Sequence, residues 1–340
     1  MTALTPKERL LRVLRKEPVD RPPVICTGGM MNAAIVEVME RTGHTLPRAH
    51  FDDGLMAALA EDVTDATGFE NLGVPFCMTV EAELLGSEVD AGTLACEPKI
   101  AREVYASVSR VEFRNVPALT SSGRIQTVIA AAGRLARAHP DYPVIASLTG
   151  PVSTAASIVD PMNFLKELRK DPEGAHRVLD YVTDLLAEYA RLALEAGATA
   201  ITIGDPTATG EILGPKMFEA FAVRHLNDLA DRIHALGAPV ILHICGDLGR
   251  VQPLLPSLRA DALSTDAMVS LKGLKAEFPQ LTTMGNLSTY LLQSGGPEQV
   301  AQRARSLVRE GVDIISPACG LSTSTALRTI AAMTAAVKET

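Results

Sequence analysis

The 340-residue chain contains no tryptophan, and aromatic residues make up only 4% of it. It therefore offers little material for an aromatic platform that stacks bases or for an aromatic carbohydrate cleft. Basic residues are also outnumbered, because 32 Lys and Arg stand against 40 Asp and Glu, and the formal net charge is -8. Phosphate backbones attract basic surfaces, so we expect no nucleic-acid partner.

Cysteine is scarce and odd in number. The five cysteines are scattered over the chain: Cys26, Cys77, Cys96, Cys245 and Cys319. A secreted disulfide framework uses an even number of regularly spaced cysteines, so this pattern favours a reducing cytoplasm. Residues 1–9 lack the apolar core of a signal peptide, and no later apolar run is long enough to cross a bilayer. We expect a soluble, cytoplasmic protein with no membrane partner.

From about residue 140 onward, short β-branched runs alternate with longer segments of helical periodicity. The runs predict strands at 143–148, 199–204, 239–244, 260–265, 281–285 and 312–316. The periodic segments predict helices at 173–198, 214–236, 297–310 and 321–338. In the first half, 6–16 and 54–66 are expected to be helical and 22–26 is a candidate strand. The alternation predicts a sheet of parallel strands.

Two architectures would produce this alternation, an open doubly wound sheet and a closed barrel. The strands are evenly spaced and the sequence has no Gly-rich dinucleotide fingerprint, which favours closure into a (β/α)₈ TIM barrel. No linker, low-complexity segment or short repeat forces a domain boundary. We therefore predict one TIM-barrel domain over residues 1–340, with a helical elaboration in its N-terminal part.

Polar side chains follow the predicted strands of the second half at the points where these strands end. They are Asp205, His243 with Cys245, Asp266, Asn286 and Cys319. The carboxyl ends of barrel strands meet at one face, and barrel enzymes carry their active sites there. The sequence therefore predicts that these six side chains gather at one end of the barrel.

The segment His243-Ile244-Cys245 predicts a metal site. Two side chains separated by one residue on an extended segment point to the same side, so both can bind one ion. Cys319 would supply a third ligand, and one His with two Cys suits Zn²⁺ better than Mg²⁺ or Ca²⁺, which prefer oxygen. The alternative is that His243 is a hydrogen-bonded core histidine and that both cysteines are buried apolar thiols.

At these positions the sequence resembles the methylcobamide:coenzyme M methyltransferases, which belong to the uroporphyrinogen decarboxylase superfamily. The segments that carry the resemblance are 242–246 (LHICG), 317–320 (PACG), 204–206 (GDP), 284–288 (MGNLS), 150–152 (GPV) and 75–80 (PFCMTV). The family pattern adds an acidic metal ligand, usually Glu, on the strand after His-x-Cys, and this place falls on Asp266. Asp266 is one methylene shorter, and it could instead cap the following helix or hydrogen-bond His243.

The resemblance implies a zinc-dependent corrinoid methyltransferase. Zn²⁺ would bind a thiol such as coenzyme M as its thiolate, and the thiolate would take a methyl group from a corrinoid (cobalamin) carried by a separate methylated corrinoid protein. The resemblance also makes Asp205 and Asn286 candidates for orienting His243 or for contacting the substrate or corrinoid. Each could equally be a turn residue.

Other functions fit the same residues. The chain could transfer a methyl group from methanol or a methyl ether to a corrinoid protein, or from a methylcorrinoid to tetrahydrofolate or another thiol. It could also be a barrel whose zinc is structural and which only docks a corrinoid protein. Uroporphyrinogen decarboxylation is disfavoured, because residues 26–31 (CTGGMM) stand where the decarboxylases carry an Arg-rich stretch for the substrate carboxylates.

Overall fold

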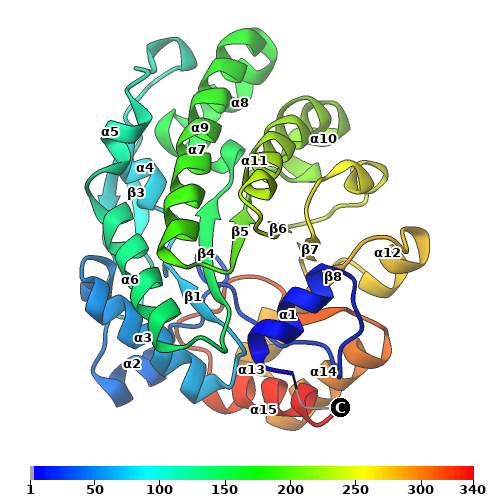
Figure 1. The fold of residues 1–340 in the computed structure, drawn as a ribbon. Helices are drawn as coiled ribbons and strands as arrows, with labels where there is room; N and C mark the ends of the chain where they lie inside the picture. Colours follow the sequence, from blue (N-terminus) through cyan, green and yellow to red (C-terminus); the bar gives the residue numbers. More distant parts are fainter. Residues whose placement is uncertain (1–3) are drawn as a thin grey trace.

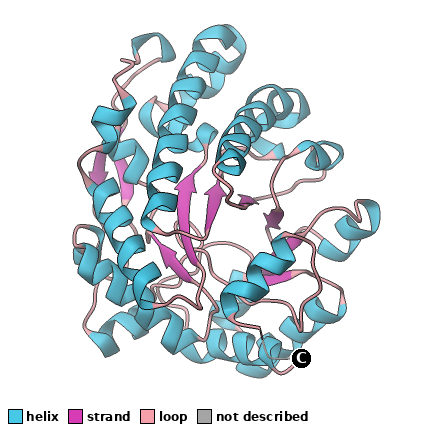
Figure 2. Cartoon of the chain, viewed as in Figure 1, coloured by secondary structure: helices cyan, strands magenta, loops and turns pink. Residues whose placement is uncertain are grey.

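The structure, a computed structural model, describes residues 4–340 and has a ring of parallel strands at its centre (Figures 1 and 2). Seven strands form one sheet in the order β1-β4-β5-β6-β7-β8-β9, and each neighbouring pair is parallel. Their bounds are β1 (Leu72–Val74), β4 (Val144–Thr149), β5 (Ala200–Gly204), β6 (Val240–Ile244), β7 (Ala262–Thr265), β8 (Thr283–Leu287) and β9 (Ile314–Pro317). The predicted strands of the second half are therefore confirmed, with boundaries that differ by a few residues.

The extended segment at residues 23–26 lies between β9 and β1 and takes the eighth position of the ring. Val24 forms a parallel bridge with Ile315 of β9. On the other side, the Asn71 side chain accepts a hydrogen bond from Cys26 N at 2.8 Å and donates one to Cys26 O at 2.9 Å. A side-chain amide carries the same donor and acceptor as a peptide group, so Asn71 extends the pairing that the short β1 begins.

Helices surround the ring on the outside (Figure 1). Those before β6 are α2 (Val36–Thr42), α3 (Asp53–Thr67), α4 (Val80–Leu84), α5 (Val116–Thr120), α6 (Arg124–Ala138), α7 (Pro151–Ile158), α8 (Pro161–Lys170), α9 (Pro172–Ala196), α10 (Gly210–Met217) and α11 (Arg224–Ala235). Those after it are α12 (Leu271–Glu277), α13 (Thr289–Ser294), α14 (Pro297–Arg309) and α15 (Leu327–Lys338). The main hydrophobic core fills the space between these helices and the strands. None of the helices in residues 4–340 combines the length and apolar character that crossing a bilayer requires.

Helix α9 shows how local sequence sets these elements. The Asp171 side chain accepts a hydrogen bond from Gly174 N at 2.9 Å, and Pro172 occupies the first helical position. The helix ends at Gly197, whose φ of 116° is left-handed and favours glycine. The predicted helix at 173–198 is thus confirmed.

The predicted helix at 214–236 is present from Pro215 on, where the end of α10, a π-helix at Phe218–Val223 and α11 follow one another without a break. Its start is set by Gly214, whose φ of 65° is not helical and which Pro215 follows. The helix predicted at 321–338 begins only at Leu327, and the residues before it form a loop that carries Cys319. An antiparallel hairpin of β2 (Glu88–Asp90) and β3 (Lys99–Arg102), which the sequence analysis did not predict, stands between β1 and β4.

Helix α1 (Pro6–Leu14) closes the amino end of the barrel. Thr5 and Glu8 form a capping box that starts the helix. The buried side chains of Leu10 and Leu14 pack into the barrel interior with residues of the strands, which include Ile145, Ile241, Met284 and Ile314. Figure 1 shows α1 lying across the ring. Only the carboxyl end of the barrel is therefore left for a substrate.

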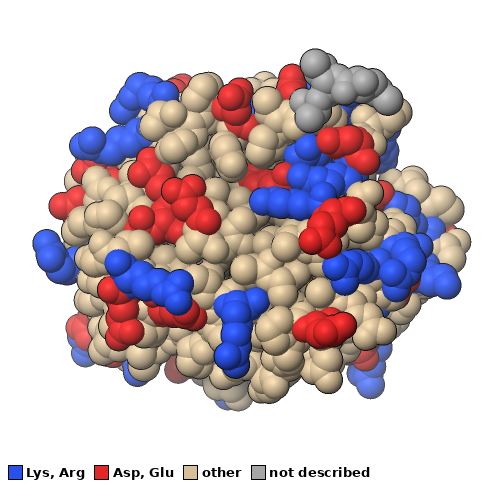
Figure 3. All heavy atoms as spheres, turned by 90° about the horizontal axis from the view of Figure 1, so that it is seen from below, with Lys and Arg blue, Asp and Glu red and all other residues tan. Residues whose placement is uncertain are grey.

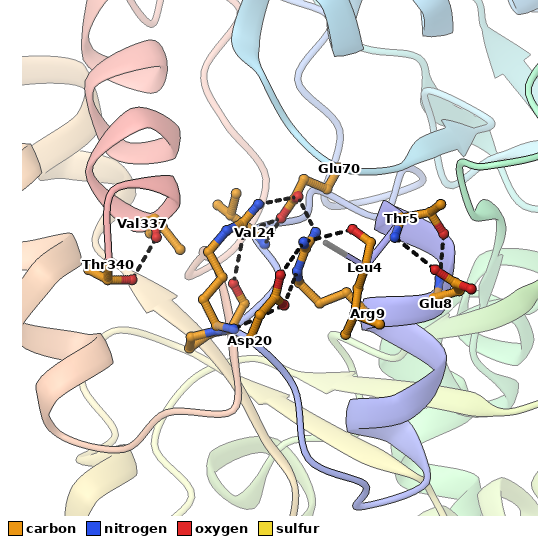
Figure 4. Close-up of polar contacts among 11 residues, drawn as sticks. Leu4, Thr5, Glu8, Arg9, Asp20, Val24, Glu70, Val337 and Thr340 are labelled. Carbon is orange, nitrogen blue, oxygen red and sulfur yellow. Dashed lines mark hydrogen bonds and ion pairs between the residues drawn. The ribbon is translucent and has the colours of Figure 1, made fainter. Parts of the chain in front are cut away.

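A buried ion network fastens α1 to the barrel (Figure 4). The Arg9 guanidinium donates to Asp20 Oδ1 at 2.7 Å and to Glu70 Oε1 at 2.7 Å. Arg21 and Val24 N also donate to the Glu70 carboxylate. Burial raises the pKa of Glu70, but hydrogen bonds from Arg21 and Val24 outweigh it and leave the pKa below its usual value. Glu70 therefore joins α1, the segment at 23–26 and the start of β1.

On the face drawn in Figure 3, charged side chains are not gathered in one place. Acidic and basic residues are interspersed over the face drawn in Figure 3, with no large field of one sign on that face. This mixture agrees with the modest excess of acidic residues in the sequence.

We expect Arg9→Met to lower the free energy of unfolding by about 3 kcal/mol, because it leaves buried carboxylate charge without one of its partners. Urea denaturation at pH 7 would measure the change. Arg12→Met is the matched control, since Arg12 lies on the same helix but is exposed, and its effect should stay below about 0.5 kcal/mol. Equal effects of the two substitutions would contradict the prediction.

Candidate metal centre

Three potential soft ligands converge at the carboxyl ends of β6 and β9. His243 Nε2 lies 3.0 Å from Cys245 Sγ, and Cys245 Sγ lies 3.5 Å from Cys319 Sγ. One ligand atom from each residue falls within 4.8 Å of the other two. Ligands bound at about 2.0–2.3 Å around a tetrahedral Zn²⁺ stand about 3.3–3.8 Å apart, so the spacing is close to that of a zinc site. The residues lie far apart in the chain and meet because their strands are parallel.

His243 is oriented by Ser264 on the neighbouring strand. The two residues are register partners in the β6–β7 pair, and His243 Nδ1 lies 2.9 Å from Ser264 Oγ. A hydrogen bond at Nδ1 directs Nε2 toward Cys245 and fixes the ring for metal binding. The sequence analysis missed Ser264, although its position two residues before Asp266 on the next strand is the signal that could have found it.

Two glycines let the backbone turn at the cysteines. Gly246 has φ 74°, a left-handed conformation that favours glycine directly after Cys245. At Gly320 a Cβ atom would stand 2.4 Å from the Met30 carbonyl oxygen, so the loop after Cys319 can approach the backbone of residue 30 only with glycine. Both glycines therefore help to place the sulfur atoms.

The two cysteines interact as a pair. The hydrogen bond from Cys245 and the neighbouring His243 together lower the pKa of Cys319 to about 5, although burial opposes them. The same hydrogen bond, together with burial, raises the pKa of Cys245. Cys319 is therefore the sulfur of the pair that ionises more readily, and a thiolate favours a soft cation.

Asp266 lies outside the group of three. It follows β7 directly and is half-buried, and its Oδ1 accepts a hydrogen bond from Met268 N at 3.3 Å. Asn286 fixes the loop at residues 266–269, because its Nδ2 donates to Asp266 O at 2.8 Å and to Val269 O at 2.7 Å. The structure therefore places Asn286 as a support for the loop that carries Asp266.

Asp205 is fully buried at the end of β5, and its carboxylate faces the start of α7. It accepts hydrogen bonds from Val152 N at 3.0 Å, Ser153 N at 2.8 Å and Ser153 Oγ at 2.6 Å. Burial raises the pKa of Asp205 to about 6 although these hydrogen bonds oppose the shift. Its link to His243 is through the backbone, where Asp205 N donates to His243 O at 3.1 Å. Asp205 thus holds α7 against the end of the barrel.

A cavity of about 840 Å³ opens beside Cys319. Its walls are the tip of the β2–β3 hairpin and the loop after β9, which are joined by a hydrogen bond from Thr323 Oγ1 to Ala95 O at 2.8 Å. Its lining includes Asp90, Glu97, Lys99, Cys319, Ser322 and Thr323. The sequence analysis assigned no function to the hairpin, because its short strands lack the alternation that marks a half-buried strand.

The fold and this site define a TIM barrel with a His-Cys-Cys group at the carboxyl ends of its strands. The chain belongs to the uroporphyrinogen decarboxylase (URO-D) family, whose sequence model matches residues 5–340.

Two methyltransferases are similar to this protein over nearly the whole chain. "Methylcobamide:CoM methyltransferase MtbA" of Methanosarcina acetivorans is 34% identical over 96% of this chain and 95% of its own length. "Methylcobamide:CoM methyltransferase MtaA" of Methanosarcina barkeri is 30% identical over 100% of this chain and 99% of its own. A solved structure, "methyltransferase from Methanosarcina mazei", matches with a TM-score of 0.93 at 30% identity and covers 99% of both chains. The predicted resemblance and the barrel fold are confirmed.

We expect Asp205→Asn to change how stability depends on pH. A raised pKa means that the folded chain binds this proton more tightly than the unfolded chain, so the contribution is largest below about pH 4 and is lost as the pH rises through 6. The stability advantage of the parent chain over the variant should therefore shrink by about 2 kcal/mol between pH 4 and pH 7. Urea denaturation at both pH values measures it.

The control for this experiment is Asp65→Asn, which removes the same charge from an exposed position on α3. Its stability difference from the parent should not change between the two pH values. A constant difference for Asp205→Asn as well would contradict the buried, protonatable state of Asp205.

Proposed function

We propose that this chain is a zinc-dependent corrinoid methyltransferase that moves a methyl group from a methylated corrinoid protein to a small thiol such as coenzyme M. The observation that carries the proposal is the meeting of His243, Cys245 and Cys319 at the open end of the barrel, beside a cavity. The relatives support the same reaction. Two are methylcobamide:CoM methyltransferases, and a third, 29% identical, is a methylated-thiol–coenzyme M methyltransferase.

The donor set fits Zn²⁺. One imidazole and two thiols are ligands that zinc binds well, and three protein ligands leave a further position for exchange, as in catalytic zinc sites. Bound there, Zn²⁺ would lower the pKa of an incoming thiol so that the thiolate is present at neutral pH. Asp266 stays the proposed fourth, exchangeable ligand, because it follows β7 beside β6 and its side-chain hydrogen bond from Met268 N is long, at 3.3 Å.

The protein's own residues prepare this reaction by position. Ser264 fixes the His243 ring, so that Nε2 stays directed toward Cys245. Asn286 holds the loop that carries Asp266, and Asp205 holds α7 at the rim of the barrel. We propose Asp205 and Asn286 as positioning residues, since their side-chain hydrogen bonds go to protein groups. Helix α1 fills the amino end of the barrel, so that reactants would bind at the carboxyl end.

A reducing, cytoplasmic location is part of the proposal. Cys245 Sγ and Cys319 Sγ lie 3.5 Å apart as free thiols, and an oxidising compartment would favour a disulfide at this distance over a metal site. The partners would be a methylated corrinoid protein and a small thiol.

The proposal predicts that His243→Ala and Cys319→Ala each lose bound zinc and lower thiol-dependent demethylation of methylcobalamin by at least about 100-fold, because each removes a ligand. Zinc per chain is measured by metal analysis, and demethylation is followed spectroscopically with coenzyme M, homocysteine and tetrahydrofolate. His44→Ala is the matched control, since His44 lies outside the group of three and does not line the cavity.

Undiminished turnover in both ligand variants would contradict the proposal. Turnover with tetrahydrofolate but with neither thiol would replace the thiol acceptor by a pterin.

A further inference from the structure

The cavity beside Cys319 carries a net negative charge. Among the described residues that line it, three are charged: Asp90, Glu97 and Lys99. Lys99 Nζ lies 3.7 Å from Asp90 Oδ2, so these two charges offset each other. No other lining residue in 4–340 is cationic, and the charge of Glu97 is left without compensation.

The Glu97 carboxylate is held in place by a buried amide. Asn32 Nδ2 donates to Glu97 Oε1 at 3.2 Å, and also to Gly29 O at 3.0 Å. Glu97 is exposed, but the cavity wall desolvates its carboxylate enough to raise its pKa; the Asn32 hydrogen bond lowers it, and the negative charge of Cys319 raises it again. The charge of Cys319 therefore acts on the Glu97 carboxylate.

Two hydroxyl groups of the wall, those of Ser322 and Thr323, are already paired, whereas the Thr93 hydroxyl accepts a hydrogen bond from Ala95 N at 3.3 Å. Thr323 Oγ1 donates to Ala95 O at 2.8 Å, and Ser322 Oγ lies 2.8 Å from Ser324 Oγ. A sulfonate needs cations and free hydrogen-bond donors to compensate its charge. Within the described lining, Lys99 is engaged with Asp90 and the Thr323 hydroxyl hydrogen is used. Compensation for an anion by the side chains of this wall is therefore limited to Lys99, which already lies beside Asp90, and the Thr93 hydroxyl.

We propose that Glu97 makes this cavity select acceptor thiols with a positively charged tail, such as short aminothiols, over thiols with an anionic tail. The inference rests on the proposed function and names the class of its acceptor. With the thiol sulfur at the group of three, the tail of the acceptor lies in the cavity beside Cys319, where Glu97 attracts an ammonium and repels a sulfonate. Coenzyme M, the acceptor in the relatives' names, carries a sulfonate and is expected to be the weaker ligand here.

The test uses the full chain loaded with Co²⁺, whose absorption spectrum changes when an added thiolate joins the cysteine ligands already present. Three thiols with the same two-carbon spacing are titrated at low ionic strength: cysteamine, 2-mercaptoethanol and 2-mercaptoethanesulfonate. We expect cysteamine to bind most tightly and the sulfonate least. Glu97→Gln should lower the ratio of cysteamine affinity to sulfonate affinity about fivefold, the size of an exposed charge interaction. Salt at 1 M should compress the parent's ratio in the same direction.

Two controls make the result specific. Glu103→Gln removes the same charge just after β3, at a residue that lines a different cavity, and should leave the ratio unchanged. The cobalt d–d absorption of each variant shows whether His243, Cys245 and Cys319 still hold the ion. Because the acidity of each thiol is the same for parent and variant, it cancels when their ratios are compared.

A parent chain that binds the sulfonate most tightly, or a Glu97→Gln ratio equal to the parent's, overturns the inference about Glu97 and leaves the proposed function standing. If none of the thiols changes the cobalt spectrum, the proposed function itself fails, and this inference fails with it.

Discussion

The parallel direction of the barrel strands is the constraint on which the candidate site depends. His243 and Cys245 follow one strand and Cys319 follows another, with two strands between them in the ring. A parallel ring puts all carboxyl ends at one face, so three side chains from distant parts of the chain come within 4.8 Å. No local feature of either segment could bring them together, and the site is therefore a product of ring closure.

Ring closure in turn depends on a few polar side chains. The segment at 23–26 has one parallel bridge to β9, and its other edge is completed by the Asn71 side chain. Glu70, the neighbour of Asn71, accepts hydrogen bonds from Val24 N and from arginines on both sides of the barrel's amino end. Two consecutive side chains before β1 thus fix the closing segment and α1 together. Figure 4 shows the contacts of Glu70 with Arg9 and Val24 at the amino end, which the side chains of α1 fill.

How far the sequence predicts this arrangement depends on which physical signal carries each part. Hydrophobic periodicity and strand-end punctuation identify the parallel strands and bring His243, Cys245 and Cys319 to one face. The periodic signal fails in the loop after Cys319, where helix was predicted from residue 321 but begins only at Leu327. Roles that depend on cross-strand neighbours are invisible to it, which is why Ser264 was missed. Side-chain direction is equally hidden: the carboxylate of Asp205 points to the amino end of α7, a contact that no spacing along the chain encodes.

The loop at 318–326 connects the metal group to the cavity. The chain is irregular over the nine residues 318–326, although helix was predicted from residue 321 on. This loop carries Cys319 at one end and meets the hairpin through the Thr323–Ala95 hydrogen bond. A helix beginning at 321 would withdraw that contact, because its backbone would pair within itself. The irregular loop therefore lets one segment supply both a sulfur ligand and a cavity wall. The same stretch of chain therefore sets the position of the Cys319 sulfur and the shape of the cavity beside it. Glu97, on the facing hairpin, is the charged group of this cavity best placed to act on a ligand bound there.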